Sequence, residues 1–280
     1  LNEVGKMRDY EILTNGLSNI ENFEEPGVDA VEFGTGNINI SMKPNASLFY
    51  SILSEECGCE VKDDFQLFAA MKDFAFFDAQ CAIGAPILGN ARGGETAAGL
   101  LAEMDRNGVD KALVAHANTE AAGAIFANEN LLELIQADDV DNRLTGVWTI
   151  LPAQCDELPP PDEFFARMAA NRVGALNLFP VAHRWQACRL TIGRLMDAAA
   201  ERRIPVFLGQ RIMDGGWRGV FDFMREFPAA TVIVNGVSLW GADRNIRPLL
   251  ENFPGCHVEL SEYWVPEGIA DLARLYGAER

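Results

Sequence analysis

The sequence predicts an α/β protein of the (β/α)8 TIM-barrel class, with an N-terminal extension and with the eighth strand missing from this chain. From about Leu100, apolar strand-like runs alternate with amphipathic helical stretches, which is the pattern of βα units around a parallel sheet. Seven such units can be counted, whereas a closed barrel has eight. With 280 residues, of which 49% are hydrophobic, the chain can bury the core that such a barrel requires.

Short apolar runs indicate the strands, and longer stretches with a 3.6-residue period indicate the helices. Strands are expected at 74–83, 111–115, 144–151, 174–179, 205–208, 231–234 and 257–260. Helices are expected at 95–107, 120–136, 162–170, 190–202, 219–227, 246–253 and 268–276. Gly108 is placed to end the first helix, and the proline-rich LPPP run opens the third.

Residues 1–73 differ from the rest and are expected to form a separate segment before the barrel of residues 74–280. They carry about half of the net charge of −18, a strand-like stretch with a glycine-rich turn (AVEFGTGNINISM) and a helical stretch at 46–56. One interpretation is a cap or oligomerisation element over one barrel end. The other is an accessory segment that packs on the barrel exterior.

Composition excludes several classes of partner. A net charge of −18 repels phosphate backbones, so neither nucleic acid nor an anionic membrane surface is an expected partner. No apolar run approaches the roughly 18 residues that cross a bilayer, and no secretion signal opens the chain, so a cytoplasmic protein is expected. The six cysteines are expected to be free thiols. A homo-oligomer is possible.

Three stretches carry a family resemblance: LLAEMDRNGVDKALVAHANTEA, NENLLELIQADDVDNRLTGVWTILP, and GALNLFP followed by AAAERRIPVFLG. In their order and spacing they resemble the amidohydrolase-related family, over about residues 76–280. These TIM-barrel proteins include metal-dependent hydrolases and decarboxylases of the aminocarboxymuconate-semialdehyde type. The resemblance implies a divalent metal held by two histidines after strand one, by histidines after strands five and six, and by an aspartate after strand eight.

At the positions that match this pattern, the metal ligands are replaced. In FFDAQCAIG, Asp78 is present but the two histidine positions hold Gln80 and Ala82, and the later positions hold Gln210 and Asn235. An amide oxygen is a weak, neutral ligand and a methyl group is none. We therefore expect no metal and no other cofactor, and expect the three amides to bind substrate through hydrogen bonds.

The position of the strand-eight aspartate would fall beyond Arg280. Because a seven-stranded barrel leaves two open edges, the natural chain is expected to continue past Arg280, or another segment is expected to fill the gap.

Two histidines are candidates for acid or base catalysis. His116 is expected at the carboxyl end of the second strand and His183 just beyond the fourth, which is the barrel face where active sites of this fold lie. Each could act as a general base, or could be a pocket or loop histidine without a proton to transfer. His257 is expected near the opposite face, in a structural role.

Further candidates follow later strands. Glu262 could act as a base if burial raised its pKa, and Trp264 could stack on a planar substrate. Arg184 and Arg211 could bind a substrate carboxylate or form local ion pairs. The sequence contains neither a Gly-x-Ser-x-Gly nucleophile motif nor a phosphate-binding Gly-x-x-x-x-Gly-Lys loop.

Two functions remain open at this point. One is a metal-independent hydrolase or carbon–carbon lyase acting on a small carboxylated or lactone substrate. The other is a non-catalytic binding or assembly protein of the same fold. In both, the expected ligand is a small molecule, and fold alone does not decide between them.

Overall fold

The computed structural model describes residues 31–33, 38–40, 75–85, 95–139, 141–237 and 241–280. The chain divides into two compact units, Leu1–Ala75 with Leu260–Glu262, and Phe76–Glu259 with Tyr263–Arg280. In the first unit, strands β1 (Val31–Phe33) and β2 (Ile38–Ile40) form an antiparallel pair in which Val31 lies opposite Ile40. This is the stretch predicted to be strand-like. The helix expected at 46–56 lies outside the described residues.

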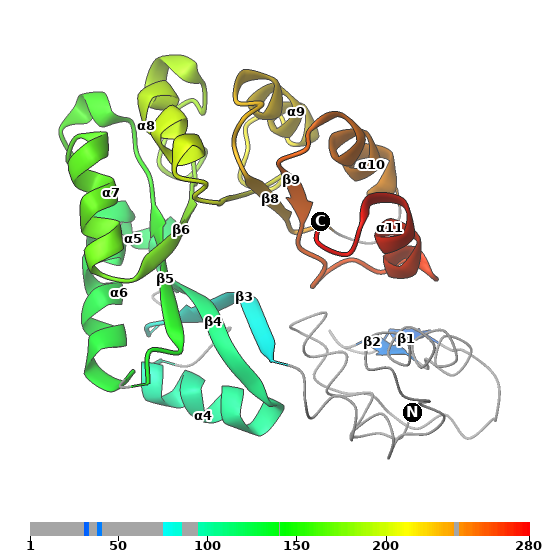
Figure 1. Ribbon diagram of the computed structural model, residues 1–280, viewed down its shortest axis with the longest axis horizontal. Coiled ribbons are helices and arrows are strands. Elements are labelled where there is room, and N and C mark those ends of the chain that lie inside the picture. The colour runs from blue at the N-terminus through cyan, green and yellow to red at the C-terminus, as the bar shows by residue number, and fades with distance from the viewer. Residues whose placement is uncertain (1–30, 34–37, 41–74, 86–94, 140, 238–240) are drawn as a thin grey trace. The chain divides into compact units, whose positions relative to one another are not determined.

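The second unit contains a seven-stranded parallel sheet whose strands follow chain order, which confirms the α/β barrel-type fold class (Figure 1). The strands are β3 (Phe76–Ile83), β4 (Val109–His116), β5 (Leu144–Thr149), β6 (Val173–Asn177), β7 (Val206–Gly209), β8 (Val232–Asn235) and β9 (Cys256–Val258). All seven coincide with predicted strands, within a few residues at their ends. A crossover between consecutive parallel strands brings every carboxyl end to the same edge of the sheet.

Helices connect successive strands. They are α4 (Ala97–Asn107), α5 (Thr119–Ala122), α6 (Ala124–Asp138), α7 (Pro161–Ala170), α8 (Arg189–Glu201), α9 (Trp217–Glu226), α10 (Asp243–Asn252) and α11 (Gly268–Tyr276), with a short 3-10 turn η1 (Ala153–Cys155). The single helix predicted at 120–136 is wrong in one respect. Gly123 breaks it into α5 and α6, because its φ of 91° and ψ of 154° belong to a region that only glycine readily adopts.

Side-chain alternation along the strands gives the sheet an inner face and a helix-facing outer face. Leu113, Val147, Ala175 and Phe207 pack together on the inner face, with Ala79, Ala115 and Ile233 against them. Residues on the other face contact the helices. Trp148 is an example, because its ring centroid lies 5.4 Å from that of Phe164 in α7. This alternation decides which residue at each strand end reaches the barrel interior.

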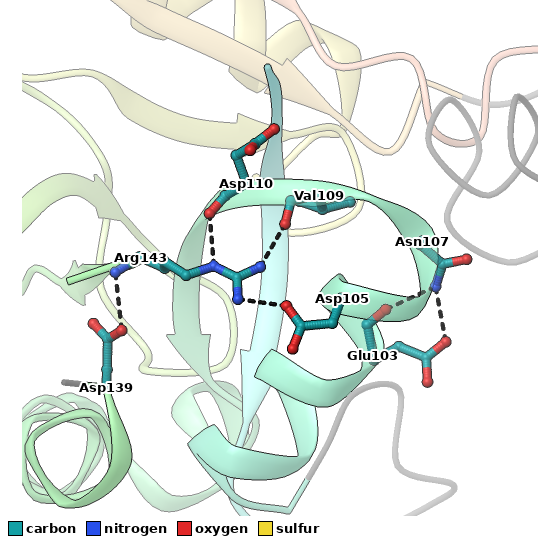
Figure 2. A network of polar contacts seen from close by, with 7 residues as sticks. All are labelled: Glu103, Asp105, Asn107, Val109, Asp110, Asp139 and Arg143. Atoms are coloured by element: carbon teal, nitrogen blue, oxygen red, sulfur yellow. Dashed lines mark hydrogen bonds and ion pairs between the residues drawn. The ribbon is translucent and has the colours of Figure 1, made fainter. Parts of the chain in front are cut away.

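A polar network at the amino-terminal end of the sheet fixes the first helix and strands to one another (Figure 2). The Arg143 guanidinium donates to the carbonyls of Val109 at 2.7 Å and Asp110 at 2.9 Å, and to the Asp105 carboxylate at 2.5 Å. The Asp139 carboxylate, at the end of α6, accepts from the Arg143 N–H at 2.9 Å. One side chain thus joins α4, β4 and the start of β5.

A repeated hydrogen bond marks where each strand begins beside its neighbour. An N–H of the preceding strand donates to the carbonyl of the residue immediately before the next strand. The five donor and acceptor pairs are Ala112 and Arg143, Gly146 and Arg172, Leu176 and Pro205, Val206 and Thr231, and Val232 and Gly255.

On β9, the Val258 N–H donates in the same way to the Arg280 carbonyl at 2.8 Å. The Arg280 guanidinium also donates to the carbonyls of Leu250, Phe253 and Cys256. Arg280 therefore holds, beside β9, the position that precedes a strand at the other junctions.

Two smaller findings complete the fold. Cys81, Cys155, Cys188 and Cys256 are free thiols, as predicted for these four. Among the described helices, none combines the length and apolar character needed to span a membrane.

Candidate functional site

The carboxyl ends of the strands place a layer of small and polar side chains on the inner face. The inward-facing residues of this layer are, in strand order, Ala82, Ala115, Thr149, Asn177, Gly209 and Asn235. Strand register pairs Ala82 with Ala115, Thr149 with Asn177, and Gly209 with Asn235, whereas Asn177 lies opposite Phe207, two residues before Gly209. Glu259 continues the layer beyond β9, because its N–H extends the ladder by donating to the Val234 carbonyl at 2.9 Å. The layer is methyl-lined at β3 and β4 and polar from β5 onward.

Thr149 and Asn177, which end β5 and β6, form a buried hydrogen-bonded pair. The Thr149 hydroxyl donates to Asn177 Oδ1, and the side chain of Thr149 is fully buried. Sequence reasoning did not select either residue. The available signal was a polar residue at the end of each otherwise apolar run, GVWT and GALN, at the parity that faces inward.

Asn235 faces the same interior from the end of β8. Its Oδ1 lies 2.6 Å, and its carbonyl oxygen 2.5 Å, from where a β-carbon on Gly209 would stand. Glycine at the end of β7 thereby makes room for the Asn235 side chain. Gln210 follows Gly209 and is half-buried. In the described part of the chain, the side-chain amides of Asn235 and Gln210 form no hydrogen bond.

His116 ends β4 as predicted, but it faces the helices rather than the interior. Its Nδ1 accepts from the Asn118 N–H at 3.1 Å, so the neutral ring carries its proton on Nε2, which donates to Asn130 Oδ1 at 3.0 Å. Phe126 of α6 packs edge-on at 5.6 Å. Burial lowers the pKa of His116, an effect that the Asn130 hydrogen bond partly opposes. Both ring nitrogens are thus occupied by protein.

His183 lies in the loop after β6, as predicted. Its Nε2 donates to the Thr119 carbonyl at 3.0 Å, so Nδ1 is the unprotonated nitrogen of the neutral ring. That Nδ1 is buried and has no hydrogen-bond partner in the part of the chain that the structure describes. The Thr119 hydroxyl in turn donates to the His116 carbonyl at 2.8 Å. The two histidines therefore meet the same threonine, but their rings do not bond to each other.

The predicted arginines both lie in loops at the carboxyl ends of strands. Arg184, next to His183, is exposed and has a φ of 60°. Among the described residues, its guanidinium forms no ion pair. Arg211 follows Gln210 and is exposed; it has an interaction partner of its own.

Three other predicted residues are not gathered with the inner layer. Gln80 is exposed and lies in a β-bulge of β3 between Asp78 and Cys81, short of the strand end. Glu262 is half-buried and belongs to the first compact unit, whereas His116 and His183 belong to the second. Trp264 is half-buried after β9. Its neighbour Tyr263 is buried and donates to Asp243 Oδ1 at 2.7 Å, a structural contact with α10.

The donor set does not fit the metal that the resemblance implies. The matching positions present amides at Gln80, Gln210 and Asn235 and a methyl group at Ala82. Over the described residues, no three histidine, cysteine, aspartate or glutamate side chains are grouped to hold an ion. The arrangement can instead donate and accept hydrogen bonds through neutral groups.

Comparison with known proteins divides the chain. Residues 1–85 match the family model of the stage IV sporulation protein A middle domain. Stage IV sporulation protein A of Clostridioides difficile (strain 630) is 43% identical over 65 residues, which make up 23% of this chain and 13% of that protein. The chain thus spans about an eighth of the length of this relative. The match falls on the segment to which the sequence assigned no family.

Solved structures similar to this chain are barrels and enzymes of low identity. An uncharacterised TIM-barrel protein, Bb4693 from Bordetella bronchiseptica, is 14% identical, covers 72% of this chain and 80% of its own, and has a TM-score of 0.47. Dihydroorotase from Campylobacter jejuni is 9% identical, and the similarity covers 70% of this chain and 56% of that one, with a TM-score of 0.46. 5-Carboxyvanillate decarboxylase LigW from Sphingomonas paucimobilis is 15% identical, and the similarity covers 72% of this chain and 85% of that one, with a TM-score of 0.42.

Proposed function

We propose that the second unit is a barrel of the amidohydrolase-related type that has exchanged its metal site for a neutral hydrogen-bonding site and binds a small polar molecule. The observation that carries this proposal is the pair of amides at Asn235 and Gln210, which are half-buried at the carboxyl ends of β8 and β7 and lack hydrogen-bond partners among the described residues. Their polar atoms are not among the buried unsatisfied atoms of the described residues, so a ligand can replace water as their hydrogen-bond partner.

Binding is favoured over catalysis by the state of the candidate acid–base groups. His116 has both nitrogens engaged and faces away from the interior. The Nε2 of His183 is engaged by the Thr119 carbonyl, and its Nδ1, although it has no hydrogen-bond partner among the described residues, is buried. A general base needs a free lone pair within reach of the substrate proton. The inner layer supplies hydrogen bonds for orientation, and these are sufficient for recognition.

The ligand class follows from the same groups. Asn235 and Asn177 end strands that are two interstrand spacings apart, about 10 Å between backbones. A small molecule with polar atoms at both ends can bridge that distance. Exposed Arg184 next to the loop histidine suits a carboxylated ligand, while a lactone or cyclic amide would be read by the amides alone.

The test is a fragment titration followed by side-chain amide NMR. Small carboxylates, lactones and cyclic amides are added to the full chain with 15N-labelled Asn and Gln. We expect at least one class to shift the Asn235 and Gln210 amide signals. Asn235→Leu should weaken its binding about five- to tenfold, the value of one lost hydrogen bond.

Asn252→Leu is the matched control, since Asn252 is exposed at the end of α10. Unchanged affinity is expected for it. Shifts confined to residues outside the strand ends, or equal weakening by both substitutions, would refute the proposed site.

A second function is favoured for the N-terminal segment by its sequence match alone. We propose that residues 1–85 act in sporulation, as the name of the matching protein states. The matching stretch of the Clostridioides difficile protein can be replaced by residues 1–85 of this chain, and heat-resistant spores counted. Spore yield near that of the parent strain is expected. A yield as low as that of a strain with the stretch deleted would oppose the assignment.

A further inference from the structure

A chain of three buried polar side chains leads from α6 to the end of β6. Asn128 in α6 donates through Nδ2 to the Thr149 carbonyl at 2.9 Å, and its Oδ1 accepts from the Thr149 N–H at 2.8 Å. The Thr149 hydroxyl donates to Asn177 Oδ1. Thr149 is wholly buried, and Asn128 and Asn177 are 7% and 8% exposed.

These bonds fix the direction in which the Asn177 amide points. A side-chain amide is planar, and its acceptor oxygen and its donor NH2 group point in different directions within that plane. Because Thr149 occupies the acceptor arm, the donor arm is the one left over. The Asn177 Nδ2 forms no hydrogen bond within the described residues. Side-chain alternation places this side chain on the inner face, where Asn235 also lies, and strand register sets it level with Ile233, two residues before Asn235.

Asn128 holds the other end of the arrangement. Its two bonds engage both the N–H and the carbonyl of Thr149, as a neighbouring strand would, at the point where the β5 ladder stops. The backbone of Thr149 is thereby held, and its hydroxyl is aimed at β6. The Ile150 N–H, which donates to the Asn177 carbonyl at 3.0 Å, ties the two strand ends together next to this pair.

We infer that Asn128 and Thr149 are positioning residues that turn the Asn177 amide so that its NH2 group is a dedicated hydrogen-bond donor for an oxygen atom of the bound molecule. The oxygen belongs to a carbonyl or a carboxylate group. The inference rests on the proposed binding function and adds a polarity to the site: the β6 position selects acceptors and rejects donors. Asn235 has no such partner among the described residues, so its amide can bind either a donor or an acceptor group of the ligand.

The test compares three probes on the full chain with 15N-labelled Asn: acetate for a carboxylate oxygen, 2-pyrrolidinone for a neutral carbonyl oxygen, and methylammonium for a donor. Thr149→Val removes the hydroxyl at nearly constant volume, and Thr149→Ser restores it. We expect acetate or 2-pyrrolidinone, and not methylammonium, to shift the Asn177 NH2 signal.

In Thr149→Val, affinity for the effective probe, read at Asn177, should fall at least threefold and recover in Thr149→Ser. A response to acetate alone assigns a carboxylate, and to 2-pyrrolidinone alone a neutral carbonyl. Binding of methylammonium at Asn177, or an unchanged response in Thr149→Val, overturns the inference. If a probe still binds at Asn235 in that case, the proposed function remains supported. If no side-chain amide signal shifts with any probe, both the inference and the proposed function are refuted.

If Thr149→Val does not fold, the wild-type protein still decides. A Thr149 hydroxyl proton that exchanges slowly with water and shows a nuclear Overhauser effect to the Asn177 side chain supports the inference. A rapidly exchanging hydroxyl overturns it.

Discussion

The His116 ring is held in its neutral form by burial and by one fixed donor. The Asn118 N–H requires an unprotonated Nδ1, and a second proton there would remove this bond and place a charge in a buried site. Gly84 contributes space, since a β-carbon there would lie 2.8 Å from His116 Nε2. A histidine at the end of a barrel strand thus serves the packing of α6.

This state predicts a pH dependence. We expect an NMR titration to give His116 a midpoint below its ordinary pKa of about 6.5. Because the folded-state pKa is the lower one, the stabilising contribution of this ring is present above pH 6.5 and is lost as the pH falls through the folded-state pKa. Urea unfolding at pH 7.5 and 5.5 should show this loss, and His116→Gln should reduce it. A midpoint at or above 6.5 would contradict the prediction.

At the residue scale, position along a strand was more predictable than direction. The strand-end locations of His116, Asn235 and Gln210 follow from the apolar runs. The face to which His116 points depends on how side chains alternate along the paired strands. A bulge of one residue reverses that alternation, as the bulge at Gln80 illustrates. The Thr149–Asn177 pair was not predicted, because a polar residue at the end of an apolar run does not show which residue the strand register sets opposite it.

Among the elements, α4, β4 and β5 depend on one guanidinium. Arg143 is only 23% exposed along its side chain and satisfies two backbone carbonyls as well as Asp105 (Figure 2). Removing it takes one donor from each of these carbonyls. Such losses cost more than exposed ion pairs do.

We therefore expect Arg143→Met to reduce the free energy of unfolding by about 1–3 kcal/mol, measured by urea denaturation. Arg106→Met is the matched control, because Arg106 pairs with Glu103 on the exposed surface of α4. Its effect should stay within about 0.5 kcal/mol. Equal effects of the two substitutions would mean that the network is not a joint between elements.

The elements themselves were accessible from the sequence. Every strand and helix of the second unit arises from a periodic apolar pattern, and Gly108 ends α4 with a φ of 69°, as expected of a glycine cap. The break at Gly123 was not foreseen, since the apolar period continues across it and only the backbone angles reveal it.

At the scale of the whole molecule, the chain joins two parts with different resemblances. The first compact unit comprises Leu1–Ala75 and Leu260–Glu262, and the sporulation-protein match covers residues 1–85. Sequence reasoning separated this segment by its charge and composition but gave it no family. The expectation that the open edge of the barrel is filled stays a prediction.

The whole protein should carry no stoichiometric metal. Elemental mass spectrometry of protein purified without chelator should find less than about a tenth of a zinc, manganese or iron per chain. Added zinc should leave the midpoint of thermal unfolding unchanged, because a ligand raises stability only if it binds the folded state. About one ion per chain, with a raised midpoint, would show that residues other than Gln80, Gln210 and Asn235 form a site.

The double hydrogen bond from Asn128 to Thr149 also has a mechanical consequence. Each residue of an α-helix advances about 1.5 Å along its axis, so a slide of α6 by a single residue would move Asn128 by about half the length of either bond, now 2.8 and 2.9 Å, and would spoil the geometry of the pair. Asn128 therefore helps to fix the height of α6 against the sheet, together with the bond between Asn130 and His116. A substitution far along α6 that pushes the helix lengthwise would be transmitted to the Asn177 amide.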